Sequence, residues 1–289
     1  MSLILPTDSA LYRTFQQMAG ERKMLFLAGL PGVGKSLLVK QMALIAQQAG
    51  RVVDLLQWDV TRAAFETNEI LQKYPEVNGV THAAIRKAVG LWARTAVYQW
   101  QQHHSNDAYL LLGEVPLIGN RLIELVQTHE DAAEAVLNSS QTLFVVPVPS
   151  KSVRQVIEAA REESIAKPQH EKETKDAPPH VLQTLWQEVA QLGYQFGLTK
   201  DAVGNTAYEP KVYTAVYRYL LQHRHHQILP IDTVLQPTNS AYDWHLNGTE
   251  LAASPVAVNR ILADLERNYT PEQLKQVTDR WAYADGSTK

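Results

Sequence analysis

The feature that most constrains the fold of this chain is a glycine-rich segment, Gly29-Leu30-Pro31-Gly32-Val33-Gly34-Lys35-Ser36. The apolar run 24–28 before it predicts a buried strand, and the apolar period of 37–49 after it predicts a helix. Glycine at three positions lets main-chain N–H groups turn inward and approach an anion closely, where a Cβ would obstruct them. The start of the helix adds more N–H groups and a partial positive charge. The segment therefore predicts a strand–loop–helix unit that binds an anion.

Two polar side chains complete the segment. Lys35 supplies an ammonium group, and Ser36 supplies a hydroxyl suited to a divalent metal ion. With the glycines they match the Walker A pattern of P-loop NTPases at every defined position, so the chain resembles that superfamily here. The resemblance implies that ATP and Mg²⁺ bind, with Lys35 on the β- and γ-phosphates and Ser36 on the metal. The implied nucleotide-binding residues are Gly29, Leu30, Pro31, Gly32, Val33, Gly34, Lys35, Ser36 and Leu37.

The rest of the chain alternates short apolar runs with helical periodicity, which favours a parallel sheet covered on both faces. We expect an α/β three-layer sandwich with a mainly parallel five-stranded sheet, the fold that the P-loop resemblance also implies, in one domain over 1–289. Strands are expected at 24–28, 52–58, 109–112, 143–148 and 227–231. Helices are expected at 7–19, 37–49, 118–137, 152–165, 181–196 and 211–223, over most of 61–104, and from Pro271 onward.

Two stretches are interpreted as insertions over this sheet. The stretch 61–107 is predicted to be a helical insertion on the substrate side. The stretch 150–210 is predicted to be lid-like, with helices on either side of the segment 166–180. That segment is rich in proline and charge and has almost nothing to bury, so we expect a mobile loop there.

Two of the expected strands are predicted to end in acidic residues. Asp59 comes after the second strand, and Glu114 comes after the third, in Leu110-Leu111-Leu112-Gly113-Glu114. The latter resembles the Walker B pattern, but glycine stands where many ATPases carry the aspartate that holds Mg²⁺. The metal role then passes to Glu114 or Asp59, and Ser36 with Glu114 is the expected metal pair. The remaining carboxylate would orient or deprotonate the group that attacks ATP.

The arginines extend the resemblance to the nucleoside and nucleotide kinase group of P-loop proteins. Those kinases place a helical substrate-binding insertion after the second strand, and Arg62, Arg86 and Arg94 follow it here. They also carry a lid after the fourth strand whose arginines clamp the transferring phosphate, which corresponds here to Arg154 and Arg161. The deoxynucleoside kinases have a Glu-Arg pair at the end of the third strand, and Arg121 follows Glu114 by seven residues. The resemblance implies an ATP-dependent kinase with a small-molecule acceptor, in which Lys35, Asp59, Glu114, Arg154 and Arg161 act in catalysis.

Two other functions stay open from the sequence. One is an ATPase or an ATP-dependent switch that acts on a protein partner, although the departure from the Walker B aspartate counts against a strong hydrolase. The other is a nucleotide-binding regulatory protein without catalysis. A GTPase is disfavoured, because the guanine-reading Asn-Lys-x-Asp motif has only an off-pattern counterpart at 198–201. The lid arginines also have a plain alternative, since charged helix faces are usually just solvated.

Composition narrows the class of partner. The formal net charge is −3, which gives no general attraction to nucleic acid or to an anionic membrane. The chain has no cysteine, so disulfides and cysteine-ligated metals are excluded. Neither a signal peptide nor an apolar membrane span is visible, and a cytoplasmic protein is expected. The acceptor and the oligomeric state cannot be deduced from these features.

Overall fold

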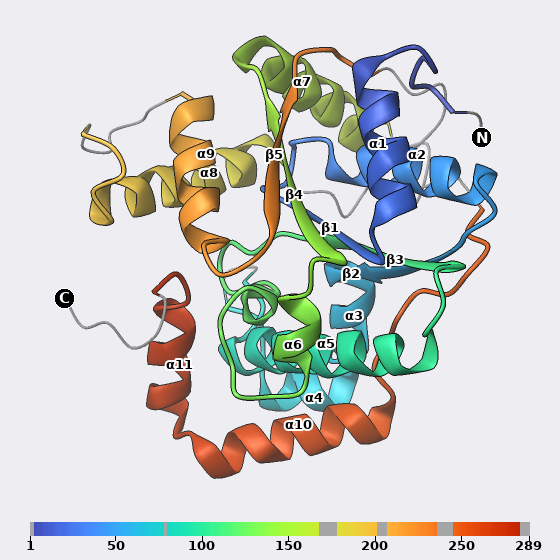
Figure 1. Cartoon of the computed structure of the whole chain (residues 1–289). Coiled ribbons are helices and arrows are strands. Elements are labelled where there is room, and N and C mark those ends of the chain that lie inside the picture. Colours follow the sequence, from blue (N-terminus) through green and yellow to red (C-terminus); the bar gives the residue numbers. More distant parts are fainter. Residues whose placement is uncertain (1–2, 78–79, 168–177, 201–206, 236–244, 284–289) are drawn as a thin grey trace.

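A five-stranded sheet forms the centre of the computed structural model, which describes residues 3–77, 80–167, 178–200, 207–235 and 245–283. The strand order is β2-β3-β1-β4-β5, and every pairing between these strands is parallel. The strands are β1 Met24–Ala28, β2 Val52–Gln57, β3 Tyr109–Val115, β4 Thr142–Pro149 and β5 His226–Ile231. The predicted α/β class and five-stranded parallel sheet are therefore confirmed (Figure 1).

Eleven α-helices and one 3₁₀ helix surround the sheet in the described part of the chain. Serine or threonine caps several of them at the N-terminus, as at Ser150 before α7 and Thr270 before α11, where the side-chain oxygen accepts a main-chain N–H. The α-helices are α1 Ala10–Glu21, α2 Lys35–Gln48, α3 Trp58–Ala63, α4 Asn68–Lys73, α5 Ala83–His103, α6 Ala133–Leu137, α7 Lys151–Ala166, α8 Pro179–Gln195, α9 Pro210–Leu220, α10 Pro255–Asn268 and α11 Pro271–Asp279, and the 3₁₀ helix η1 is Ile123–Leu125.

Side chains of each strand alternate between two hydrophobic cores, one on each face of the sheet. In β1, Leu25 and Leu27 face α1 and α2, while Met24 and Phe26 face α5 and α9. Figure 1 shows α1 and α2 on one side of the sheet, with α5 on the other and α10 beyond it. The arrangement is a three-layer sandwich with an extra helix outside α5.

The stretch 118–137 differs most from its prediction. We expected a helix, but it contains only η1 and the short helix α6, joined by irregular chain. Leu117, Asn120 and Leu122 have left-handed backbone conformations, with φ of 66°, 57° and 64°. Such conformations cannot continue a right-handed helix. The apolar residues that suggested a helical period are instead buried individually against α5 and the sheet.

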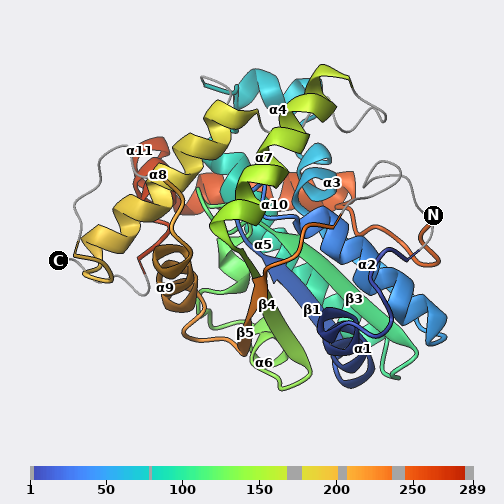
Figure 2. The ribbon, with the colours of Figure 1, turned by 90° about the horizontal axis from the view of Figure 1, so that it is seen from above.

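Some boundaries also differ. β3 continues through Gly113 and Glu114 to Val115, and β2 ends at Gln57, so that Trp58 and Asp59 form the first turn of α3. Helix α10 was not expected at all. In the predicted lid region, α7 and α8 lie side by side (Figure 2), and residues 168–177 of the expected loop lie outside the described residues.

Candidate functional site

The glycine-rich loop connects β1 to α2 at the point where the strand order reverses. β2 and β3 lie on one side of β1, and β4 and β5 lie on the other. Ligands of open α/β sheets bind beyond the carboxyl ends of the strands at such a point. Gly32 and Gly34 have φ of 76° and 84°, conformations that side chains disfavour. Gly34 caps α2 without any side-chain hydrogen bond, so the first N–H groups of α2 have no side-chain cap.

Lys35, Ser36 and Glu114 meet at the start of α2. The Ser36 hydroxyl donates a hydrogen bond to Oε1 of Glu114 over 3.0 Å, and Nζ of Lys35 lies 3.9 Å from the same oxygen. The ammonium group also donates to the Leu30 carbonyl over 2.8 Å. Gln57, at the end of β2, donates to the other oxygen of Glu114 over 3.3 Å. The predicted lysine, hydroxyl and carboxylate are thus brought together.

The alternation of β3 explains why Glu114 and not residue 113 contributes the carboxylate. Gly113 lies on the α5 side of the sheet, where an added Cβ would come within 2.1 Å of the Phe26 ring. Glu114 points to the opposite face, which α2 covers. An acid at position 113 would therefore face away from Ser36.

Burial perturbs both charged groups of this cluster. Lys35 is 5% exposed, and desolvation lowers its pKa from 10.5 to about 8, although the nearby Glu114 opposes the shift. Burial raises the pKa of Glu114 above its ordinary value, while Lys35 and the Ser36 hydrogen bond act against the increase. A ligand that places negative charge beside Lys35 and a cation beside Glu114 would stabilise the charged forms of both groups.

Asp59 lies nearby but outside this contact. Its side chain is 86% exposed in the first turn of α3, with Oδ1 3.8 Å from Nη2 of Arg62. The expectation that it ends a strand is wrong, because the chain has already turned into a helix at Trp58. Its charge still influences the pKa of both Lys35 and Glu114, so it belongs to the same edge of the sheet.

Arg154 of the predicted lid reaches the glycine loop. Its side chain is fully buried, donates to the Pro31 carbonyl over 3.3 Å and pairs with Glu158 at 2.5 Å. The guanidinium also lies over the Tyr208 ring, 5.3 Å from its centre. Arg161, two turns further along α7, contributes to the pKa of both Lys35 and Glu114. Both lid arginines therefore lie on the side of the glycine loop, and Arg154 is not a solvated surface residue.

Two further residues that contact the loop were not predicted from the sequence. Tyr213 of α9 accepts a hydrogen bond from the Leu30 main-chain N–H over 3.3 Å, and its hydroxyl would lie 2.5 Å from a Cβ at Gly29. Leu182 of α8 lies 3.1 Å from the position of a Cβ at Gly32. These contacts explain why glycine is required at both positions. The only sequence signal was the aromatic spacing of Tyr213 and Tyr217 on one helix face.

The arginines of the insertion separate into two groups. Arg62 and Arg86 lie near the carboxyl ends of the strands, beside Arg121. Arg94 lies elsewhere: it is 1% exposed and is paired with Asp131 at 2.6 Å and Glu134 at 2.8 Å. Helix α5 carries both Arg86 and Arg94, but Arg94 lies two turns further from the N-terminus of the helix. Arg94 therefore holds the chain after β3 in place and does not join the site.

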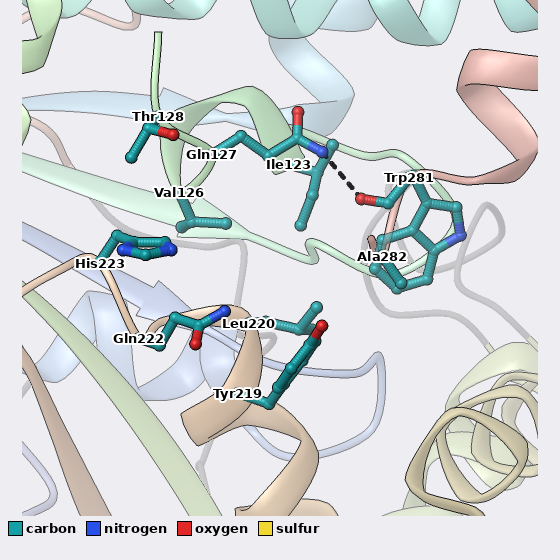
Figure 3. Close-up of a pocket in the computed structure, with 10 residues that line it drawn as sticks. All are labelled: Ile123, Val126, Gln127, Thr128, Tyr219, Leu220, Gln222, His223, Trp281 and Ala282. Carbon is teal, nitrogen blue, oxygen red and sulfur yellow. Dashed lines mark hydrogen bonds between the residues drawn. The ribbon is translucent and has the colours of Figure 1, made fainter. Parts of the chain in front are cut away.

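A separate small cavity lies between η1, the end of α9 and the chain after α11 (Figure 3). Gln127 donates to the Trp281 carbonyl across one side of it over 2.8 Å. Its wall includes Tyr219, Leu220, Gln222 and His223, which lie shortly before the amino end of β5, so the cavity is remote from the glycine loop. Its lining includes no arginine, lysine or carboxylate, and it is not the candidate site.

Searches against protein-family models, curated proteins and solved structures return no match to this chain. Among the described residues, no helix is both long and apolar enough to cross a bilayer. Nor do three or more histidine, aspartate or glutamate side chains of that part cluster in a way that could hold a metal ion.

Proposed function

We propose that this protein is a P-loop kinase that binds ATP with Mg²⁺ at Gly29–Ser36 and transfers the γ-phosphoryl group to a small-molecule acceptor. The observation that carries the proposal is the contact of Ser36 and Lys35 with the same oxygen of Glu114. This contact lies at the N-terminus of α2, whose N-cap residue Gly34 has a left-handed backbone conformation. Anions favour such an N-terminus, and divalent cations favour a hydroxyl beside a carboxylate.

The residues present fit both ligands. The loop glycines leave main-chain N–H groups without the obstruction of a Cβ, and Lys35 supplies positive charge for the β- and γ-phosphates. Ser36 and Glu114 would hold the Mg²⁺ directly or through water. When bound, the metal neutralises the phosphate oxygens during transfer.

The chain's own groups would then do three things. Lys35 stabilises the charge that develops on the transferred group, and its burial strengthens this interaction because water is excluded. Arg154 and Arg161, from α7, neutralise phosphate oxygens on the lid side. Glu114 is occupied with Ser36, which leaves Asp59, exposed at the start of α3, to orient or deprotonate the acceptor hydroxyl.

The first test is ADP release from ATP and Mg²⁺, with and without pools of nucleosides, nucleotides, sugars and hydroxylated metabolites. The Lys35→Ala protein serves as the blank, and direct ATP binding is measured in parallel. Stimulation of ADP release by one pool, absent with Lys35→Ala, is the expected result.

Two results would overturn the proposal at different levels. Failure to bind ATP would reject nucleotide binding itself. Binding with slow ADP release that no pool changes would reject the kinase and leave a partner-dependent ATPase or switch. Glu114→Gln distinguishes a non-catalytic regulator from a kinase or an ATPase. The biological output of a regulator would survive Glu114→Gln and be lost only with Lys35→Ala.

A further inference from the structure

Three arginines converge beyond the carboxyl ends of β2 and β3. Arg62 in α3 donates to the Thr81 hydroxyl over 3.2 Å, and Arg86 in the first turn of α5 donates to the Thr81 carbonyl over 3.0 Å. Arg86 also donates to the Gly119 carbonyl over 2.7 Å. The guanidinium of Arg121 lies against the same glycine, 2.8 Å from the position of an added Cβ. Three separate segments thus bring these side chains to one place.

The turn that carries Arg121 is built at a cost in backbone energy. Leu117 and Arg121 pair in antiparallel fashion, with the Leu117 N–H donating to the Arg121 carbonyl over 2.9 Å. In this turn and directly after it, Leu117, Asn120 and Leu122 all have positive φ. Such conformations are strained for residues that carry a side chain, and they tend to persist where function requires them. Both leucine side chains are fully buried, which offsets part of this cost.

The charge of the three arginines is not balanced equally. Arg62 has carboxylate oxygens of Asp59, Glu66 and Glu76 within 3.8 Å. Within the described ranges, neither Arg86 nor Arg121 has a carboxylate oxygen within 4.0 Å of its guanidinium. Their nearest hydrogen-bond acceptors are main-chain carbonyls.

Desolvation lowers the pKa of Arg121 and of Arg86, and more distant acids only partly oppose this. For Arg121 the opposing acids are Glu188 and Asp59, and for Arg86 they are Asp279, Glu188 and Glu124. The like charges of Arg86 and Arg62 lower the pKa of Arg121 further. An oxyanion between Arg86 and Arg121 would relieve both effects.

This cluster lies beside the proposed phosphoryl-transfer site. The carboxylate charge of Asp59 raises the pKa of Lys35 and of Glu114 in the proposed transfer site, and it also raises the pKa of Arg121 in the cluster. β3 also connects the two places directly, because Glu114 precedes the turn that ends at Arg121. A molecule held by Arg121 would therefore lie within range of the Asp59 carboxylate charge.

We propose that Arg86 and Arg121 bind an anionic group of the acceptor, so that the substrate is a phosphomonoester or a carboxylic acid that also carries the hydroxyl to be phosphorylated. The assignment of this anion to the acceptor rests on the proposed kinase function, whereas the anion site itself does not depend on it. Guanidinium groups bind both kinds of anion through paired hydrogen bonds.

The test measures anion binding without nucleotide. Full-length Lys35→Ala protein, in which the glycine loop has lost its lysine ammonium group, is titrated calorimetrically with phenyl phosphate, benzoate and benzyl alcohol at constant ionic strength. The same titrations are made after adding Arg121→Met, Arg86→Met or, as a matched control, Arg260→Met on the exposed face of α10. Two site variants are included because either one alone could disturb folding.

We expect one of the two anions to bind and benzyl alcohol not to bind. Arg121→Met and Arg86→Met should each weaken the binding by about tenfold or more, and Arg260→Met should not change it. Phenyl phosphate as the ligand would identify a phosphomonoester substrate, and benzoate a carboxylic acid. Absence of anion binding, or binding that both site variants retain, would overturn the inference. Persistent anion binding in a protein without acceptor-dependent ADP release would reject the kinase and not the anion site.

Discussion

The Ser36 hydroxyl donates to Glu114 across 3.0 Å, although 78 residues separate them in the chain. The contact exists because β3 pairs with β1 in parallel, which places Glu114 opposite Leu27, just before the glycine loop. Alternation along β3 then turns this side chain towards α2. The two groups form the proposed metal site, and the first prediction concerns them.

Glu114→Gln should reduce kcat roughly 100-fold at saturating ATP, because the neutral amide is a far weaker ligand for Mg²⁺. The Mg²⁺ concentration at half-maximal rate should rise, which a metal titration of the rate would measure. Asp59→Asn is the matched control: it should lower kcat but leave the Mg²⁺ dependence unchanged. The reverse pattern would assign the metal to Asp59.

Nucleotide affinity should depend on pH through Lys35. Its pKa of about 8 means that the free protein loses this positive charge as the pH rises above that value. The Kd for ATP should therefore increase above about pH 8, by at most about tenfold per pH unit, since one proton is involved. Fluorescence titrations from pH 7 to 10 would measure it, and Lys35→Met should bind more weakly with a flat profile. An unchanged wild-type Kd across this range would contradict the role of Lys35.

Lys35 should affect folding stability in the opposite direction: the free energy of unfolding should rise above about pH 8, where ATP binding weakens. The unfolded chain holds the Lys35 proton up to pH 10.5, whereas the folded chain releases it near pH 8. Burial of the charged form then costs ~3 kcal/mol below pH 8, and this cost disappears between pH 8 and 10.5. Urea unfolding should thus show Lys35→Met stabilised over wild type at pH 7, with the difference shrinking as the pH rises.

Arg154→Met should lower kcat by about 100-fold while leaving the affinity for ADP nearly unchanged, because the guanidinium is proposed to contact the transferring phosphate. Single-turnover kinetics would separate this effect from binding. Glu158→Gln removes the ion-pair partner of Arg154 but keeps the guanidinium, and it should retain most activity. Equal losses in both variants would indicate that Arg154 only anchors α7 to Pro31.

Local patterns predicted the part of the site that lies within one strand–loop–helix unit. The glycine spacing located the loop, and the positions of Lys35 and Ser36 followed from it. The Thr270-Pro271 start of α11 was likewise predicted from its cap, and Thr270 forms a capping box there. These features depend on neighbours in the sequence, which is why the sequence was sufficient for them.

Contacts between distant segments could not be predicted in the same way. The period of 118–137 suggested a helix, but the residues following Pro116 are held by Arg86, Arg94 and Arg224 through main-chain carbonyls. Those hydrogen bonds take the place of a helical ladder, and no local pattern shows them. The contact of Tyr213 with the glycine loop spans 183 residues and is equally invisible in the sequence.

Gly113→Ala should destabilise the protein by about 1–3 kcal/mol, because the new methyl group meets the Phe26 ring, which stacks on Phe144. Gly20→Ala is the control: nothing lies within 4 Å of its added Cβ in the last turn of α1, and it should stabilise by up to about 1 kcal/mol. Chemical denaturation of both variants measures the difference. Equal stabilities would mean that Phe26 moves aside freely.

Arg94→Met should destabilise the protein by about 3–5 kcal/mol, because it leaves the buried Glu124 carbonyl and the Asp131 carboxylate without the guanidinium, and Glu134 keeps Arg224 as its cationic partner. The loss should be largest above about pH 4 and smaller in acid. The Arg94 hydrogen bond lowers the pKa of Asp131, so the stabilisation disappears as the pH falls through that lowered value. Urea unfolding from pH 3 to 7 measures this. The KM values for ATP and acceptor should stay unchanged in the folded variant, and a raised KM at wild-type stability would return Arg94 to the substrate site.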